Sequence, residues 1–290
     1  MIKKHPLIDL EIDISDAMSR HSADIVIPYK KVGSQPVYLG YFLPKKYDPQ
    51  KEYPAFVFVH GGGWVSHMIF EDQEVWAGDY LGYLARYYAD KGFISVSIDY
   101  RLVLDSGQKE NYGLINCYED CCDAMDYIQY HAKEYGIDAS QMYLLGESAG
   151  GYLAAALATF HHDKQYKFKK VFLVNAITHL YDKWKYIVPI QSKHSDLKNL
   201  TVKARTDFLS PLKQLDKSCG EIFLFHGECD PVVNIEHSQL FYDKMATLKI
   251  PCELHIFEDT IHAFLLAEYY DQGLQACKNT ISIIDTAIEN

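Results

Sequence analysis

The clearest chemical signal in the sequence is the segment Gly146-Glu147-Ser148-Ala149-Gly150-Gly151, a G-x-S-x-G pattern. The apolar run 142–145 precedes it and the small and apolar run 152–158 follows it, so we expect a buried strand that turns into a packed helix. The glycines suit a strained turn that another backbone approaches closely. Such a turn would expose the Ser148 hydroxyl at a helix N-terminus, whose partial positive charge favours an oxyanion.

A serine hydroxyl is a poor nucleophile at its own pKa and needs a neighbouring base. His262 could take the serine proton and return it to a leaving group, and Asp230 could hold the imidazole in the required tautomer. Each residue also has an ordinary interpretation, because a lone loop histidine is usually a surface residue and Asp230 before Pro231 could start a turn. The case for a catalytic triad of Ser148, Asp230 and His262 therefore depends on their order and context.

A second aspartate, Asp259, lies closer to His262 in the sequence and competes for the role of the acid. The acid must reach the imidazole nitrogen that faces away from the serine, from a separate fixed loop. Asp230 follows the preceding predicted strand and meets that requirement. We expect Asp259 to shape the histidine loop through a local side-chain-to-backbone bond.

Three glycines, Gly61, Gly62 and Gly63, follow directly after the apolar run 55–59. Glycines let the backbone approach a ligand closely, so their N–H groups could converge on one oxygen atom as an oxyanion hole. A plain glycine turn is the alternative. Because ligands collect at the carboxyl ends of strands in open α/β sheets, the glycine loop, nucleophile, acid and base are all expected at one edge.

The elements that must position these groups alternate along the chain. Apolar runs predict strands at 37–44, 55–59, 93–98, 142–145, 171–174, 221–225 and 253–257. Helices are expected at 78–91, 117–135, 152–158, 235–248 and from about 269 to the C-terminus. This alternation predicts an α/β fold with a mostly parallel central sheet and helices on both faces. Alternating isoleucine and leucine residues near 8–14 and isoleucines at 25 and 27 hint at early edge strands.

The alternation breaks between 175 and 211, where tryptophan, tyrosine and aliphatic residues make the segment too apolar for a linker. Insertions of this size are usually lids or linkers. We therefore predict a single domain over 1–290 with a small cap insertion at about 176–210.

Two groups of reactive side chains are expected to be structural. Asp99 and Arg101 follow the strand at 93–98 and are interpreted as an ion pair or network beneath the site. Cys117, Cys121 and Cys122 share one helical stretch, where a metal site is conceivable but buried free thiols are the preferred interpretation.

The bulk properties exclude several classes of protein. The formal net charge of −11 disfavours nucleic acid as a partner. The N-terminus has no apolar core typical of a secretory signal, and no run is long enough to span a membrane, so a cytoplasmic protein is expected. A homo-oligomer is left open.

Four motifs together carry a resemblance to a known family. They are His60-Gly61-Gly62-Gly63-Trp64, Gly146-Glu147-Ser148-Ala149-Gly150-Gly151, His226-Gly227-Glu228-Cys229-Asp230-Pro231-Val232 and Asp259-Thr260-Ile261-His262-Ala263-Phe264. Over about 37–290 the chain resembles the α/β-hydrolase esterases of the hormone-sensitive-lipase group and their bacterial relatives.

The resemblance implies that Gly62, Gly63 and Ala149 supply the oxyanion N–H groups and that Gly61 supports the turn. Trp64 is also similar to its counterpart in kynurenine formamidases and the feruloyl-esterase-like branch, and Trp64 and Glu147 are candidate substrate-binding residues. The chain has less N-terminal material than the long lipases, which argues against a water-insoluble lipid substrate.

The predicted function is a serine carboxylesterase that hydrolyses short-acyl esters through an acyl-enzyme on Ser148, without metal or cofactor. Its expected partner is a small-molecule ester, with acetylated sugars and aryl esters as candidates. An arylformamidase would use the same groups on an N-formyl substrate. A peptidase of the prolyl-oligopeptidase type would need a propeller domain for which the chain has no room, and a non-catalytic binding module usually has a broken triad.

Overall fold

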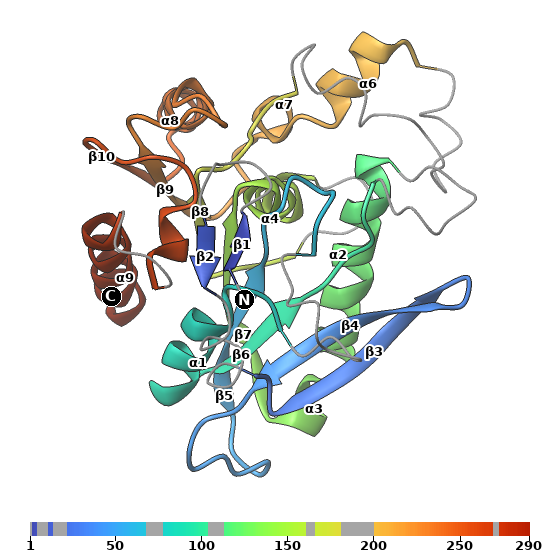
Figure 1. Ribbon diagram of the computed structural model, residues 1–290. Helices are drawn as coiled ribbons and strands as arrows, with labels where there is room; N and C mark the ends of the chain where they lie inside the picture. Colours follow the sequence, from blue (N-terminus) through green and yellow to red (C-terminus); the bar gives the residue numbers. More distant parts are fainter. Residues whose placement is uncertain are drawn as a thin grey trace.

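The structure is a computed structural model that describes residues 2–4, 11–13, 22–67, 78–103, 113–160, 166–180, 200–268 and 273–290. Its centre is an eight-stranded sheet with the order β10-β9-β8-β7-β5-β6-β4-β3 (Figure 1). The strands are β3 (Ile25–Val32), β4 (Gln35–Phe42), β5 (Tyr53–Val59), β6 (Ile94–Ile98), β7 (Ile137–Glu147), β8 (Lys170–Val174), β9 (Glu221–Gly227) and β10 (Cys252–Phe257). A separate antiparallel pair joins β1 (Ile2–Lys4) to β2 (Glu11–Asp13).

The sheet is parallel from β10 to β6 and antiparallel only where β4 pairs with β6 and with β3. Parallel neighbours need crossover connections, and most of these connections contain a helix. The helices are α1 (Gly82–Asp90), α2 (Leu114–Tyr130), α3 (Ala132–Tyr135), α4 (Ala149–Thr159), α6 (Val202–Phe208), α7 (Pro211–Gln214), α8 (Glu236–Leu248) and α9 (Leu274–Glu289), with the 3₁₀ helix η2 at Phe264–Glu268. The predicted fold class, a mostly parallel sheet with helices, is confirmed.

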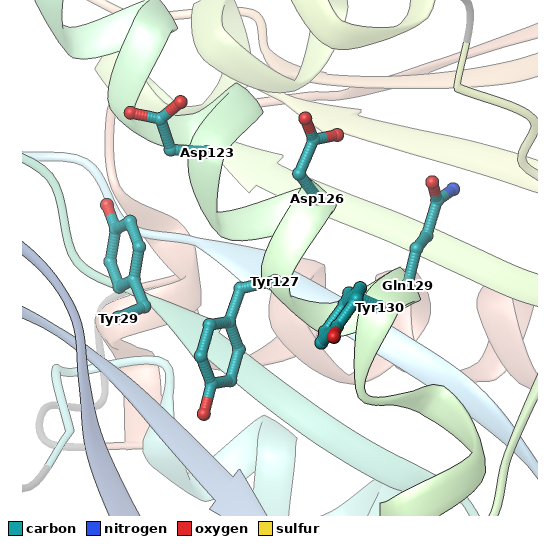
Figure 2. Close-up of a pocket in the computed structure, with 6 residues that line it drawn as sticks. All are labelled: Tyr29, Asp123, Asp126, Tyr127, Gln129 and Tyr130. Carbon is teal, nitrogen blue, oxygen red and sulfur yellow. The ribbon is translucent and has the colours of Figure 1, made fainter.

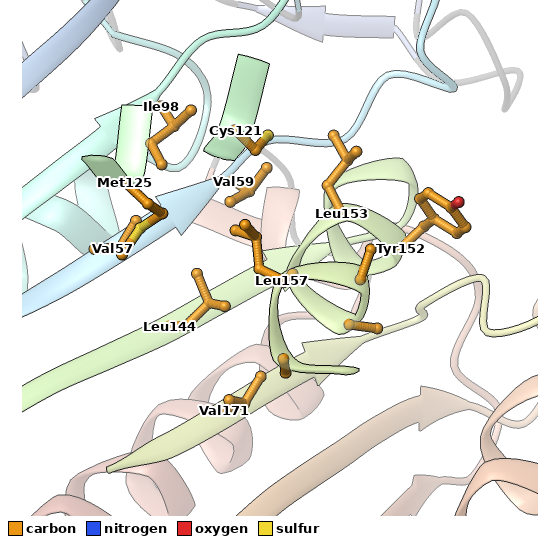
Figure 3. Close-up of a cluster of buried hydrophobic side chains, with 14 of the residues drawn as sticks. Val57, Val59, Ile98, Cys121, Met125, Leu144, Tyr152, Leu153, Leu157 and Val171 are labelled. Atoms are coloured by element: carbon orange, nitrogen blue, oxygen red, sulfur yellow. The ribbon is translucent and has the colours of Figure 1, made fainter. Parts of the chain in front are cut away.

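Residues that alternate along each strand belong to two separate cores. On β5, Val57 and Val59 pack into a core with α2, α4 and α8, whereas Phe56 and Phe58 pack into a core with α1 and α9. Figure 3 shows the first core, in which Leu153 and Leu157 of α4 lie over the aliphatic side chains of the central strands. Because both faces of the central strands are covered, these strands are apolar without interruption.

The core on the α1 side is rich in aromatic rings. Phe56 lies within 6.0 Å, centroid to centroid, of the rings of Phe58, Tyr88, Phe93, Tyr143 and Phe172. Aromatic pairs at these distances stabilise a core by about 0.5–1.5 kcal/mol each beyond their buried area. The sheet that carries the functional loops is therefore rigidly packed on both faces.

The structure differs from the sequence prediction in several elements. The strand expected at 142–145 extends back to Ile137 in β7, and the helix expected at 117–135 is divided at His131 into α2 and α3. Within the predicted cap insertion, residues 202–208 form α6. Thr201 caps the N-terminus of this helix, because its side chain accepts a hydrogen bond from the N–H of Ala204. Residues 181–199 of that insertion lie outside the described residues.

Candidate active site

Ser148 lies at the turn between the central strand β7 and α4. Its φ of 55° and ψ of −116° place it in a strained backbone region that non-glycine residues rarely adopt. The turn is this tight because the helix packs directly on the neighbouring strand: a Cβ at Gly150 would lie 2.1 Å from the carbonyl oxygen of Val59. The N–H of Ser148 donates to the carbonyl of Val174 at 2.8 Å, which fixes the turn against β8.

The structure brings the three predicted triad residues together from three separate strands. Nε2 of His262 lies 2.9 Å from Oγ of Ser148, and Nδ1 of His262 lies 2.6 Å from Oδ2 of Asp230. Asp230 follows β9, His262 follows β10, and both side chains are buried together with Ser148. This continuous chain of hydrogen bonds has the geometry that general-base activation of a serine requires.

The carboxylate of Asp230 is held from both sides. Its Oδ1 accepts hydrogen bonds from the N–H groups of Val232 and Val233 at 2.8 and 2.9 Å, which leaves Oδ2 directed at His262. The loops that carry the acid and the base are tied together, because the N–H of Cys229 donates to the carbonyl of Thr260 at 2.9 Å.

Nδ1 of His262 is bound by Asp230, and among the described residues the side chain of Asp259 makes no hydrogen bond. The expectation that it shapes the loop through a local bond is therefore not met. Asp259 instead has a positive φ of 51°, a conformation that aspartate and asparagine tolerate better than most side chains.

The environment of His262 favours its protonated form. Burial lowers the pKa of His262, but the hydrogen bond to Asp230 and the negative charges of Asp230 and Glu147 outweigh this effect, so the pKa lies above its ordinary value. A raised pKa indicates stabilisation of the imidazolium, the species that forms when a histidine takes the serine proton.

The glycine loop after β5 lies beside the serine turn. Gly62 and Gly63 have φ values of 102° and 63°, and the carbonyl of Gly62 accepts hydrogen bonds from the N–H groups of Val65 and Ser66. Within the described ranges, no acceptor is recorded for the N–H groups of Gly62, Gly63 or Ala149. These are the donors that the family resemblance implies for an oxyanion hole.

Tyr80 is a structural support of this loop that the sequence did not single out. Its hydroxyl accepts a hydrogen bond from the N–H of Gly61 at 3.1 Å and donates to the carboxylate of Glu147. A Cβ at Gly61 would lie 2.5 Å from the Glu147 carboxylate, so only glycine fits there. Tyr80 belongs to an aromatic stripe with helical spacing, and that spacing gave no sign of its polar contact.

Glu147 and Trp64, the two candidate substrate-binding residues, are buried in this structure. Trp64 is fully buried and packs edge-on against Tyr152, with ring centroids 5.5 Å apart. The carboxylate of Glu147 faces Tyr80, with its other oxygen 4.0 Å from Nε2 of His262. These placements favour internal support of the loop and the serine turn over direct contact with a substrate.

The expectation for Asp99 and Arg101 is an ion pair or a network, and its ion-pair form is wrong, because each residue contacts other polar groups. Arg101 instead forms a bidentate ion pair with Asp120 of α2. Its Nε lies 2.7 Å from Oδ2 and its Nη2 lies 2.6 Å from Oδ1. Asp99 faces two histidines, His60 and His67.

The cysteines of the helical stretch are free thiols. Burial raises the pKa of both Cys117 and Cys121, which keeps these thiols neutral. A neutral buried thiol is a poor metal ligand, since metals bind the thiolate. The interpretation as buried free thiols is confirmed for these two residues.

A pocket of about 630 Å³ is formed mainly by side chains of α2 (Figure 2). It is lined by Tyr29, Asp123, Asp126, Tyr127, Gln129 and Tyr130. None of these residues belongs to the serine, histidine or glycine loops, so this pocket is not part of the candidate active site.

Residues 39–245 match the model of the BD-FAE family. The chain belongs to the BD-FAE family. A solved structure similar to this member of the BD-FAE family is native Est2, an esterase from the Planctomycetes species Thermogutta terrifontis, with 26% identity, a TM-score of 0.72 and coverage of 92% of this chain and 91% of that chain.

The butyrate-bound form of the same esterase has 26% identity, a TM-score of 0.71 and coverage of 92% and 93% of the two chains. The form phosphorylated by paraoxon has 24% identity and a TM-score of 0.72 over 92% and 93% of the chains, which supports the shared fold. The expected resemblance to α/β-hydrolase esterases is confirmed. In the part of the chain that the structure describes, no helix is both long and apolar enough to cross a bilayer.

Proposed function

We propose that this BD-FAE family member is a serine carboxylesterase that hydrolyses short-acyl esters through an acyl-enzyme on Ser148. The observation that carries the proposal is the chain of hydrogen bonds from Ser148 through His262 to Asp230, at 2.9 and 2.6 Å. The reaction class, carboxylic-ester hydrolysis, follows from the family and from the structural match to an esterase at 26% identity.

In the proposed reaction, Oγ of Ser148 attacks the ester carbonyl carbon while Nε2 of His262 takes the hydroxyl proton. The carbonyl oxygen becomes an oxyanion that accepts hydrogen bonds from the N–H groups of Gly62, Gly63 and Ala149. The C–O bond to the alcohol then breaks, and His262 gives its proton to the leaving oxygen.

Water completes the cycle. His262 takes a proton from the water that attacks the acyl-enzyme, and it returns this proton to Oγ of Ser148 as the acid leaves. Asp230 orients the imidazole through Nδ1 and stabilises its positive charge in both half-reactions. The proposed steps need neither a metal nor a cofactor.

We propose acetyl to butyryl esters as the preferred substrates. The butyrate-bound form of Thermogutta terrifontis Est2 supports a short acyl group, since that related esterase binds a four-carbon acid. The catalytic side chains are themselves almost completely buried, with Ser148 2% and His262 1% exposed. An arylformamidase remains the second candidate, because the same atoms could act on an N-formyl group.

The proposal is tested by covalent labelling with a fluorophosphonate, followed by hydrolysis of p-nitrophenyl acetate. We expect Ser148→Ala to abolish labelling and to lower turnover by about 10⁴- to 10⁶-fold, as loss of a triad member does. The matched control is Ser140→Ala, since Ser140 is exposed and makes only local hydrogen bonds with Asp138. Unchanged labelling of Ser148→Ala would refute the proposed nucleophile.

A substrate panel separates the two candidates. p-Nitrophenyl esters from acetate to octanoate, acetylated xylo-oligosaccharides and N-formylkynurenine would be compared by kcat/KM. The esterase proposal expects the ester series to exceed N-formylkynurenine, and the opposite order would favour the arylformamidase.

A further inference from the structure

Three metal-binding side chains converge behind the glycine loop. His60 is the residue before Gly61, His67 lies at the far end of the same loop, and Asp99 follows β6. Nε2 of His60 and Nδ1 of His67 lie 3.4 and 2.7 Å from Oδ1 of Asp99, and the three ligand atoms all lie within 4.8 Å of one another. None of the three side chains takes part in the proposed ester hydrolysis.

The orientation of His60 is fixed. Its Nδ1 lies 2.8 Å from the carbonyl oxygen of Gly61, and a carbonyl only accepts, so Nδ1 carries the hydrogen. The ring stacks on Tyr100 with centroids 4.4 Å apart and planes 9° apart, and the Tyr100 hydroxyl donates to the carbonyl of His60 at 2.8 Å. These contacts leave the ring no freedom to rotate.

The second nitrogen of His60 then lacks a partner. With hydrogen on Nδ1, the neutral ring presents a lone pair at Nε2, and this buried atom has no hydrogen-bond partner among the described residues. It faces the carboxylate of Asp99, which also carries only lone pairs when ionised. Two acceptors that face each other in a fully buried position repel unless a proton or a metal cation lies between them.

The Asp99 side chain is only 4% exposed and lies between the two imidazoles, with Oδ1 facing both rings.

We propose that Nε2 of His60, Nδ1 of His67 and Oδ1 of Asp99 bind one divalent transition-metal ion, with Zn²⁺ as the preferred ion. Imidazole nitrogens favour zinc and its neighbours, whereas calcium and magnesium prefer sites made of oxygen ligands alone. The hydrogen bond from Nδ1 of His60 to a backbone carbonyl is the typical outer contact of a zinc-bound histidine.

The geometry suits a tetrahedral ion. Zinc bonds of about 2.05 Å give ligand-to-ligand distances of about 3.35 Å, and the His60–Asp99 distance is already 3.4 Å. The His67–Asp99 distance of 2.7 Å must open by roughly 0.6 Å. His67 can move this far because its side chain is 30% exposed, and water would take the fourth position of a tetrahedral ion.

The proposed ion would hold the two ends of the glycine loop together. His60 and His67 bracket Gly62 and Gly63, so a metal bound to both would close the loop and anchor it to the end of β6 through Asp99. The ion itself would not touch Ser148. Metal binding would therefore stabilise the fold whether or not the proposed ester hydrolysis is correct.

The experiment measures Zn²⁺ binding to the purified, chelator-treated protein by competition with a chromogenic chelator, together with the unfolding temperature. The test variant is His67→Ala, chosen because the partial exposure of His67 allows the variant to fold. The matched control is His131→Ala, since Nδ1 of His131 also lies 2.7 Å from a carboxylate oxygen, that of Glu134, and its side chain is 26% exposed.

We expect the wild type and His131→Ala to bind one equivalent of Zn²⁺ and His67→Ala to bind it at least tenfold more weakly. At about a hundredfold excess over Kd, Zn²⁺ should raise the unfolding temperature of the first two proteins by about 5 °C. It should leave His67→Ala nearly unchanged.

Co²⁺ provides a spectroscopic check. Nitrogen and oxygen ligands in a tetrahedral site give visible d–d absorption without thiolate charge transfer, and this absorption should be missing in His67→Ala. Equal Zn²⁺ affinity in all three proteins, or a thiolate charge-transfer band from the free cysteines, would overturn the proposal.

Discussion

Replacement of Asp230 by asparagine tests the proposed acid, and the structure fixes how the new amide must lie. Oδ1 of Asp230 accepts two backbone N–H groups, those of Val232 and Val233. In Asp230→Asn the amide oxygen must take that position, because an NH₂ group there would face two donors. The NH₂ group is thereby directed at Nδ1 of His262, 2.6 Å away in the wild type.

The consequence for the imidazole follows from hydrogen-bond polarity. An NH₂ group donates, so Nδ1 must accept and the hydrogen moves to Nε2, the nitrogen 2.9 Å from Oγ of Ser148. His262 then cannot take the serine proton. We expect kcat to fall by about 10⁴, or about 5.4 kcal/mol in the barrier, while the two backbone hydrogen bonds keep the loop folded.

The assay is kcat on p-nitrophenyl acetate, with Asp259→Asn as the matched control. The same chemical change at Asp259 should leave kcat within about twofold, since Asp259 is exposed and asparagine accepts its positive φ of 51°. The reasoning fails if Asp230→Asn keeps kcat within tenfold of the wild type, or if Asp259→Asn is the more damaging change.

Three further predictions follow from the same site. The pKa of His262 is raised, so kcat/KM should fall as the pH drops through a midpoint above 6.5. The same shift contributes stability that is fully present below pH 6.5 and is lost as the pH rises through the folded pKa, which pH-dependent urea unfolding would measure. Tyr80→Phe should lower kcat and cost about 1–3 kcal/mol of unfolding free energy, since it leaves Gly61 N–H and Glu147 without their shared partner. Tyr41→Phe is its control, because the buried Tyr41 hydroxyl has no hydrogen-bond partner among the described residues and its loss should be neutral. Activity across p-nitrophenyl esters should peak from acetate to butyrate and fall by octanoate, since extra methylenes in a filled pocket cost about 1–3 kcal/mol; a profile that rises to octanoate would contradict this.

The fold was largely predictable because its core strands are covered on both faces. A buried strand such as β5 has a continuous apolar run that contrasts sharply with the polar turns around it. Short helices such as α6 were missed, since a seven-residue helix has little periodicity to detect. Thr201, which caps α6, was the available signal.

The candidate site was predictable where a backbone constraint appears in the sequence. Gly150 and Gly61 are glycines because a Cβ would meet other atoms at 2.1 and 2.5 Å, so the motifs reflect the geometry directly. Tyr80 and the pairing of Asp99 with His60 and His67 leave no such trace. These contacts join residues that are distant in the sequence, and only the sheet order brings them together.

The position of β10 at the edge of the sheet has a consequence for how heat inactivates the molecule. In the described sheet β10 pairs with β9 alone, and it is partly exposed, with Ile256 41% accessible, whereas Ser148 follows the buried central strand β7 (Figure 1). Edge elements with few buried contacts open at lower free energy than the centre of a domain. Detachment of β10 would withdraw His262 from Ser148 while most of the helices and strands persist. Loss of turnover on heating should therefore precede loss of circular dichroism, and cross-links that fasten the C-terminal edge should extend the working temperature more than repacking the centre.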